Sequence, residues 1–315
     1  YSAGRGAWSG RGSPRDGFAA SWRADSASRF SRCAATRYAT GMPEIPDLEA
    51  IRGFLNERIV GVEVTKAEAL IPHVVRSGAA DFEAALTGNR FGEVLRRGKF
   101  LLFGLADERV LVVNPMLAGR FQYLQPGDRK RPKTCVIMQL EDGWQLRYSD
   151  RLLMGKIYVV AADAIMSVPM FAEMGPDALE VNEDEFRGRI KKHSGAIKNI
   201  LTNYKFIAGI GNAYSDEILF EARINPFRKR TTLSDAEIGA LYRAIGTTLR
   251  RCIKIVSAQF RDELDYSEWR DHLKIHRKGS DGADKQKGRC PRCGTHITEI
   301  APSQRVTSYC RTCQV

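Results

Sequence analysis

The chain has 315 residues, with 49 lysines and arginines against 37 aspartates and glutamates, so its net charge is +12. This length is enough for about two domains with a substantial core. The charge favours a polyanionic partner, nucleic acid first, and leaves a merely basic protein as the alternative. No apolar run reaches the roughly 18 residues of a membrane-spanning helix, which excludes a helical membrane protein. Cys33, Cys135 and Cys252 are scattered, which indicates a reducing compartment rather than a disulfide framework.

The first 41 residues are rich in Arg, Ser, Gly and Ala, and Asp16 and Asp25 are their only acids. They contain no apolar stretch that would form the core of a secretory signal. This composition is typical of an organellar transit peptide, and equally of translated upstream sequence or a cloning remnant, which we favour. We therefore expect residues 1–41 to be a disordered leader or non-native extension, outside the fold.

A helix is predicted directly after this leader. Pro46 suits the first helical turn, and the acids around it suit the positive end of the helix dipole. The apolar residues that follow share one helical face, and a glycine then ends the helix. These residues are Leu48, Ile51, Leu55 and Ile59, followed by Gly61.

Two pairs of apolar segments come next, and each pair flanks a short polar turn. The pairs are residues 100–103 with 110–113, and residues 135–140 with 144–148. Such continuous apolar strands predict hairpins that are buried on both faces, as in a β-sandwich. The pattern loosens at residues 167–185, where two prolines and a glycine indicate a domain boundary.

The second half reads as helical. Helices are predicted from Ala196 to about Tyr204, from residues 209–212 to Ala222, and from residues 233–237 towards Ile255. Gly209-Ile-Gly211-Asn212 opens the second of these helices, and free backbone N–H groups there suit a phosphate. An ordinary glycine turn between helices is the alternative.

The last 26 residues contain two Cys-x-x-Cys pairs, Cys290 with Cys293 and Cys310 with Cys313, separated by sixteen residues. This spacing predicts a closed tetrahedral four-sulfur zinc site, structural rather than catalytic because no coordination position stays open. A disulfide pair or a redox Cys-x-x-Cys motif is the alternative. The β-rich residues between the pairs predict a hairpin, which carries Arg305 just before the second pair.

Together these features resemble the formamidopyrimidine-DNA glycosylase and endonuclease VIII family of base-excision repair enzymes, in colinear order over residues 42–315. The resemblance implies an α+β protein with a β-sandwich domain flanked by helices (42–170), a helix–two-turns–helix domain (180–275) and a zinc-bearing hairpin (276–315). The matching segments are Met42-Pro-Glu-Ile-Pro-Asp-Leu-Glu49, Arg97-Gly-Lys-Phe100, Leu146-Arg-Tyr-Ser-Asp150, Gly175-Pro176, Ala196-Ile-Lys198, Phe206-Ile-Ala-Gly-Ile-Gly-Asn212, Ile224-Asn-Pro226, His276-Arg-Lys-Gly279 and residues 290–314.

The resemblance also implies roles for single residues. Pro43 would be the amine nucleophile, Glu44 the acid that opens the sugar ring, and Lys99 an aid to β-elimination. Arg305 would hold a phosphate and assist δ-elimination. Lys198 and Asn212 would contact phosphates, and Leu117 would act as the wedge that enters the duplex. The alternatives are that Pro43 only marks the start of a helix, and that Lys99 and Arg305 are solvated surface charges.

The residues that read the lesion depart from the family pattern. Leu153 and Met154 stand where relatives carry an arginine and an aromatic residue, and a histidine is missing near Lys133. The loop that covers 8-oxoguanine in relatives reads Ser257-Ala-Gln-Phe-Arg-Asp262 here. An apolar side chain cannot make the bidentate contact that discriminates a base. The damage preference is therefore open.

These observations predict a bifunctional DNA glycosylase and abasic-site lyase that removes oxidised bases and needs only one structural zinc ion. An abasic-site or single-strand lyase with weakened base recognition, and a non-enzymatic damage-binding protein, are the alternatives. A zinc-bearing transcription regulator is less favoured, because nothing in that role requires Pro43 and Glu44. We expect a monomer that acts on damaged double-stranded DNA without a membrane. It would be cytoplasmic and nucleoid-associated, or organellar if the leader is a real transit peptide. Activity would require a chain that begins at Pro43.

Overall fold

The fold is taken from a computed structural model, which describes residues 42–260, 264–265, 270–276, 288–301 and 305–315. The expected leader lies outside the described residues, as do residues 261–262 of the altered loop, residues 277–279 and Gln304. All described elements belong to the unit Thr40–Val315. Among the described helices, none is long and apolar enough to cross a membrane.

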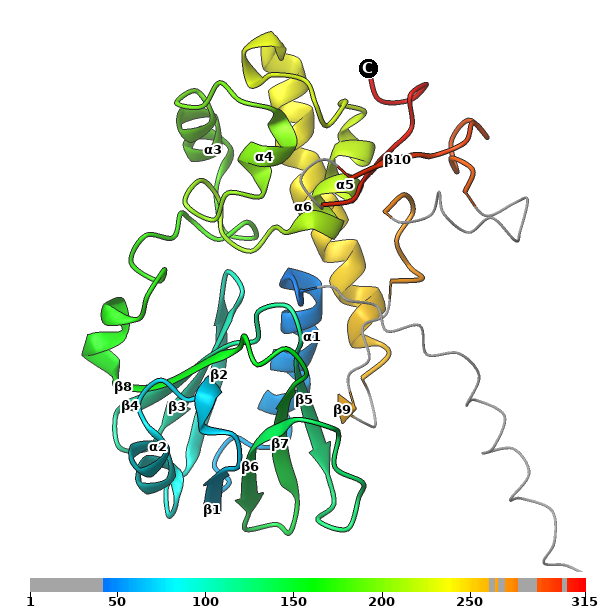
Figure 1. Ribbon diagram of the computed structural model, residues 1–315. Coiled ribbons are helices and arrows are strands. Elements are labelled where there is room, and N and C mark those ends of the chain that lie inside the picture. Colours follow the sequence, from blue (N-terminus) through cyan, green and yellow to red (C-terminus); the bar gives the residue numbers. More distant parts are fainter. Residues whose placement is uncertain (1–41, 261–263, 266–269, 277–287, 302–304) are drawn as a thin grey trace, which may run out of the picture. The chain divides into compact units, whose positions relative to one another are not determined.

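Two antiparallel sheets form a sandwich (Figure 1). Both predicted hairpins are present, one in each sheet, as β3 with β4 and β6 with β7. The five-stranded sheet contains, in spatial order, β1 (Val64–Ala69), β6 (Thr134–Leu140), β7 (Gln145–Asp150), β5 (Gly119–Leu124) and β9 (Leu264–Asp265). The four-stranded sheet contains β2 (Phe91–Arg97), β3 (Phe100–Leu105), β4 (Arg109–Asn114) and β8 (Lys156–Ala161).

Aromatic side chains join the two sheets across the core. The Phe103 ring on β3 lies 5.9 Å from the Phe121 ring on β5, which lies 5.3 Å from the Tyr148 ring on β7. The outer face of β3 and β4 is also covered, since Phe100 packs against Phe171 from the segment that follows β8. Burial on both faces is why these strands read as continuous apolar runs.

Helix α1 (Ile45–Asn56) begins as the sequence predicts but ends earlier than Gly61. A turn over residues 57–61 follows it, and Gly61 takes a left-handed φ of 81° while its N–H donates to the Phe91 carbonyl. Ile59 is fully buried in this turn rather than on the helix. Helix α2 (Ala79–Leu86) was not predicted, and its apolar side packs on the same core.

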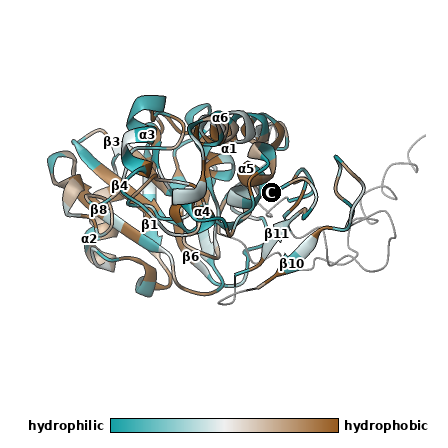
Figure 2. Cartoon of the chain, turned by 90° about the horizontal axis from the view of Figure 1, so that it is seen from above, coloured by the Kyte–Doolittle hydropathy of each residue, from teal (hydrophilic) through white to brown (hydrophobic). Residues whose placement is uncertain are grey.

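The second half is helical, as predicted, and has its own apolar cluster. Its helices are α3 (Glu183–Ile190), α4 (Ile197–Leu201), α5 (Asn212–Ala222) and α6 (Asp235–Ser257), and α4 stops three residues before the predicted Tyr204. Ser234 and Glu237 cap α6 reciprocally. Figure 2 shows both hydrophilic and hydrophobic residues along α6, which buries its apolar face. It lies alongside α1 (Figure 1).

Short 3-10 turns occur at η1 (Pro72–Val74), η2 (Ala162–Ser167) and η3 (Arg230–Thr232). The predicted terminal hairpin is present as β10 (Thr298–Ile300) and β11 (Thr307–Tyr309), with Thr298 opposite Tyr309. Buried contacts of Phe220 and Ile275 with Cys290 and Cys310 attach it to the helical region.

Candidate active site and zinc centre

The start of α1 fixes the backbone of residues 42–44. The Glu44 N–H donates to Asp47 Oδ2 at 2.9 Å, and Asp47 is fully buried. Arg270 pairs with the same carboxylate at 3.2 Å and donates from Nη2 to the Met42 carbonyl at 3.2 Å. Pro43 is buried between these contacts. These hydrogen bonds to the residues on both sides of Pro43 therefore fix its position.

The Glu44 carboxylate lies at the N-terminus of α5, 167 residues or more along the chain. It accepts N–H bonds from Gly211 at 2.7 Å, Ala213 at 3.0 Å and Tyr214 at 3.3 Å. These N–H groups are among those that a helix leaves without a partner in its own backbone, and the helix dipole favours a negative charge there. Gly209-Ile-Gly-Asn212 thus opens a helix as predicted, but its N–H groups bind an internal carboxylate.

Lys99 lies beside this carboxylate, in the turn between β2 and β3. A Cβ atom on Gly211 would overlap both the Glu44 carboxyl carbon and Lys99 Nζ, so the three residues are in contact. Lys99 Nζ also lies 3.3 Å from Met42 Sδ. Burial lowers the pKa of Lys99, and the Glu44 charge opposes this shift. A lysine with a lowered pKa is a better proton acceptor at neutral pH.

Lys198, Asn212 and Arg305 come together at the zinc hairpin. Lys198 Nζ donates to Asp216 Oδ1 at 2.6 Å, Thr307 Oγ1 at 2.9 Å and the Val306 carbonyl at 3.2 Å. Asn212 Nδ2 donates to the same carbonyl at 2.8 Å. Burial lowers the pKa of Lys198. The adjoining Arg305 is exposed, and its positive charge also lowers the pKa of both Lys198 and Lys99.

The predicted wedge, Leu117, is exposed in the loop between β4 and β5. The turn after β7 lies next to it, since Gly119 pairs with Asp150. The Asp150 carboxylate shapes that turn by accepting N–H bonds from Leu152 at 2.9 Å, Leu153 at 3.0 Å and Gly155 at 2.5 Å.

The conformation of this turn decides which of its two leucines faces outward. Leu153 has a left-handed φ of 54°, and its side chain packs against the sandwich core. Leu152 and Met154 are the exposed residues instead. Leu152, which the sequence analysis did not single out, therefore occupies the outward position beside Leu117. No sequence signal marks the left-handed residue of this turn.

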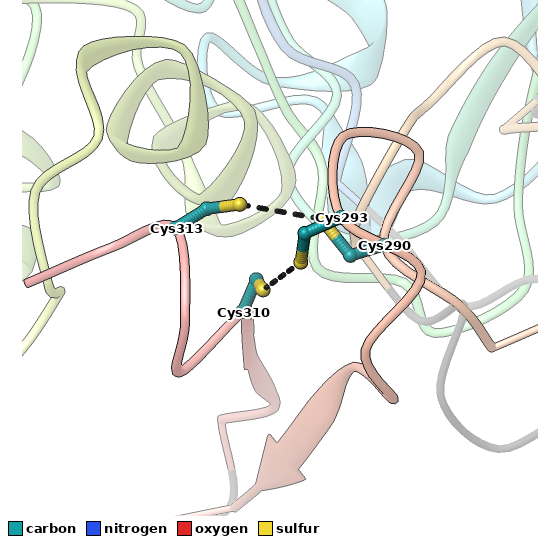
Figure 3. Close-up of side chains that lie close together, drawn as sticks. All are labelled: Cys290, Cys293, Cys310 and Cys313. Atoms are coloured by element: carbon teal, nitrogen blue, oxygen red, sulfur yellow. Dashed lines mark hydrogen bonds between the residues drawn. The ribbon is translucent and has the colours of Figure 1, made fainter.

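The four cysteines converge in the structure (Figure 3), and their sulfur atoms all lie within 4.8 Å of one another. The Cys290 and Cys313 sulfurs are 3.8 Å apart, and the Cys293 and Cys310 sulfurs are 3.4 Å apart. Tetrahedral zinc with Zn–S bonds of about 2.3 Å places its sulfurs roughly 3.8 Å apart. A disulfide would need about 2.05 Å. The donor set therefore fits one zinc ion and not a disulfide.

Other residues of the site were missed by sequence reasoning. Asp216 is buried and accepts bonds from Lys198, from His276 Nδ1 at 2.7 Å and from the Ser308 N–H at 3.0 Å. Glu217 is buried beside it and accepts N–H bonds from residues 274–276. The available signal was an acidic pair within the otherwise apolar stretch of α5. Arg270 gave no signal, because Asp47 and Met42, which accept its hydrogen bonds, lie more than 200 residues away in the chain.

Comparison with known proteins gives three domain matches. They are the formamidopyrimidine-DNA glycosylase N-terminal domain over residues 42–157, the formamidopyrimidine-DNA glycosylase H2TH domain over residues 174–262, and a zinc finger found in FPG and IleRS over residues 288–315. With the four-cysteine cluster, the third match assigns one structural zinc ion to the hairpin.

Whole proteins match as well. The chain is 34% identical over 280 residues to the formamidopyrimidine-DNA glycosylase of Pelotomaculum thermopropionicum, covering 87% of this chain and 99% of the relative. It is 32% identical over 283 residues to that of Heliobacterium modesticaldum, covering 87% and 100%.

Two solved complexes of Lactococcus lactis Fpg resemble the fold. One contains N7-benzyl-Fapy-dG DNA (TM-score 0.77, 28% identity, covering 86% of this chain and 99% of that chain). The other contains abasic-site DNA (TM-score 0.77, 27% identity, covering 86% and 99%). The domain matches, the relatives and the fold agree, and the chain belongs to the formamidopyrimidine-DNA glycosylase family.

Proposed function

We propose that the protein is a bifunctional DNA glycosylase and abasic-site lyase, with the secondary amine of a chain beginning at Pro43 as nucleophile. The observation that carries this proposal is the environment of Pro43. Pro43 is buried and adjoins Glu44, whose carboxylate is held by three backbone N–H groups and lies beside the Lys99 ammonium. A buried proline needs neither group for packing. Relatives from the same family include proteins solved with Fapy and abasic-site DNA.

The chemistry is redox-neutral. An α-amine with a pKa near 8 is about a tenth neutral at pH 7, which a lysine near 10.4 is not. Its lone pair attacks C1′ of the damaged nucleoside, and the C1′–N bond to the base breaks with its electron pair leaving on the base. The new ammonium then loses its proton, and the released base gains one. The nitrogen lone pair next expels O4′, which takes a proton from Glu44, and an iminium remains.

Strand cleavage follows from this iminium. Lys99 removes a proton from C2′, and the 3′ phosphate leaves with the C3′–O electron pair. A second elimination, assisted by Arg305, releases the 5′ phosphate. The lowered pKa of Lys99 supports its role as the base.

We assign Lys198 and Asn212 to a DNA phosphate. Both donate to the Val306 carbonyl, which follows the exposed Arg305 in the chain, so two side-chain donors converge next to an exposed positive charge. Leu117 is proposed to enter the duplex. The substrate is damaged double-stranded DNA carrying an oxidised base, bound by a monomer.

A second candidate is an abasic-site lyase with weakened base recognition. The observation that favours it is the apolar character of the exposed residues just before β5 and just after β7. Leu117, Leu152 and Met154 can fill a gap in a base stack but cannot hydrogen-bond to a base edge. A damage-binding protein without activity would leave Pro43 unreactive.

Borohydride trapping separates these candidates. Protein beginning at Pro43 should give a covalent adduct with abasic-site DNA and with duplexes that contain oxidised bases, and the adduct should map to Pro43. An adduct on a lysine would refute the assignment, and no adduct at all would favour the binding protein. Adducts with abasic-site DNA alone would favour the second candidate. Glu44→Gln should suppress base removal far more than cleavage at a preformed abasic site. Displacement of the base becomes irreversible only when Glu44 opens the sugar ring, whereas a preformed abasic site is partly an open aldehyde that the amine can attack directly.

A further inference from the structure

Arg270 is a described residue of the candidate active site for which neither the sequence nor the family match supplies a role. Its guanidinium is anchored on two sides. Nη1 donates to the buried Asp47 carboxylate at 3.2 and 3.4 Å, and the guanidinium carbon lies 5.2 Å from the centre of the buried Tyr214 ring. The third contact is the 3.2 Å bond from Nη2 to the Met42 carbonyl oxygen. The side chain is only 16% exposed.

The Met42 carbonyl marks the position of the substrate. Its carbon is bonded to the Pro43 nitrogen at about 1.3 Å. In the proposed reaction the same nitrogen bonds to C1′ of the sugar, so C1′ must occupy nearly the same place once Met42 has been removed. The Met42 oxygen then lies close to the groups attached to C1′. Arg270 Nη2 is within hydrogen-bond distance of that oxygen.

Two heteroatoms are attached to C1′ in the substrate, O4′ of the sugar and the nitrogen of the base. Glu44 is proposed to protonate O4′. Lys99 lies beside Glu44, in contact with Gly211. Arg270 reaches the Met42 carbonyl from a different element, after β9, where Asp47 and Tyr214 hold it. This leaves the base as the group that Arg270 faces.

We propose that Arg270 is a catalytic residue that stabilises the departing base. When the C1′–N bond breaks, its electron pair is left on the base, and the Arg270 guanidinium donates a hydrogen bond to that charge. Arginine stays protonated in proteins, so it acts as a fixed positive donor and does not transfer a proton. A donor held in place by Asp47 and Tyr214 before the reaction is the arrangement that stabilises developing charge most effectively.

This inference rests on the proposed Pro43 mechanism, and its test is base removal compared with abasic-site cleavage. In protein beginning at Pro43, Arg270→Met should lower the single-turnover rate of base excision by about a hundredfold, the usual cost of one such donor. Cleavage and borohydride trapping of preformed abasic-site DNA should stay within about threefold of the unsubstituted protein, because no base departs there. The normal abasic-site reaction also shows that the variant is folded.

Arg58→Met is the matched control. Arg58 also places its guanidinium over an aromatic ring, 3.8 Å from the Phe54 centre, and also pairs with a carboxylate, but it lies just beyond the far end of α1. Excision by this variant should be unchanged. A series of lesions whose free bases differ in acidity adds a second measurement. Without Arg270 the excision rate should depend more steeply on the acidity of the base, which a structural role would not produce.

The outcomes are distinct. Equal losses of excision and abasic-site cleavage in Arg270→Met would make Arg270 a structural or phosphate-binding residue and overturn the inference. Unchanged excision would overturn it as well. Failure of the unsubstituted protein to form an adduct with abasic-site DNA would instead refute the Pro43 mechanism itself.

Discussion

At the residue scale, the absence of a side chain at Gly211 is what allows Glu44 and Lys99 to meet. A Cβ atom there would overlap both groups. We predict that Gly211→Ala lowers base excision by about a hundredfold, the typical cost of displacing a catalytic group by about 1 Å. Single-turnover excision by protein beginning at Pro43 measures the effect. Unchanged excision would mean that Glu44 does not need its place at the start of α5.

Gly53→Ala is the control for this substitution. Gly53 lies inside α1, and an added Cβ atom would meet nothing within 4 Å. Alanine favours a helix interior over glycine by about 1 kcal/mol, so the free energy of unfolding should rise by about that amount while excision stays the same. Thermal unfolding and the same excision assay check both results.

We predict that Leu152 determines how well the protein distinguishes the base opposite the lesion. The unsubstituted protein should excise 8-oxoguanine at similar rates opposite all four bases, because the exposed residues of this turn offer no hydrogen bonds. Leu152→Arg should create a preference for cytosine, since a bidentate contact discriminates by about 1–3 kcal/mol. Leu153→Arg should not, because that side chain packs against the core. A hundredfold preference for cytosine in the unsubstituted protein would contradict this prediction.

The sequence could predict single residues only where they belong to a local motif. The cysteines could be identified because their neighbours in the chain form a pattern. The roles of Pro43 and Glu44 come from a local motif as well and stay predictions. Leu152 and Arg270 could not be identified in this way. The side to which Leu152 points depends on a left-handed residue, and the place of Arg270 depends on Asp47, 223 positions away.

At the element scale, the zinc hairpin holds the proposed phosphate contacts in position. Its strands are three residues each, too short to be stable without the metal. We predict one zinc ion per chain. Cys290→Ser should lose the metal and the binding of DNA while the sandwich core, which contains no residue of the hairpin, stays folded.

Metal analysis, DNA titration and circular dichroism check this prediction together. Cys135→Ser is a suitable control, because Cys135 is a buried cysteine of β6 outside the cluster. Active protein that contains no zinc would contradict the structural role.

Elements with a strong local pattern were predicted, and those without one were missed. β3 and β6 are buried on both faces and read as unbroken apolar runs, whereas β1 has a short polar sequence in which only Val64 and Ala67 are buried. Helix α1 was predicted too long, because Ile59 continues the apolar spacing but is buried by a turn. Periodicity reports burial, and burial does not require that the helix continues.

At the scale of the whole molecule, the active site joins two apolar cores. Residues 42–44 precede α1, which packs on the sandwich core, while the Glu44 carboxylate binds the first turn of α5 in the helical region. The basic charge of the chain suits a DNA partner, and family membership agrees with it. Neither composition nor periodicity could predict that these two regions meet at one carboxylate, because that contact depends on tertiary packing.

The central claim is that the Pro43 amine is the nucleophile, and the most direct test is to compare two chains. In the 315-residue chain, Pro43 is bonded to Met42 through an amide, whose nitrogen lone pair is delocalised into the carbonyl. Met42 also occupies the place that the proposed reaction assigns to C1′, with its carbonyl bonded to Arg270 and its sulfur beside Lys99. The long chain, verified as intact by mass spectrometry, should therefore show no excision of an oxidised base, whereas protein beginning at Pro43 should excise it from the same duplex. Equal excision by the two chains would contradict the proline mechanism.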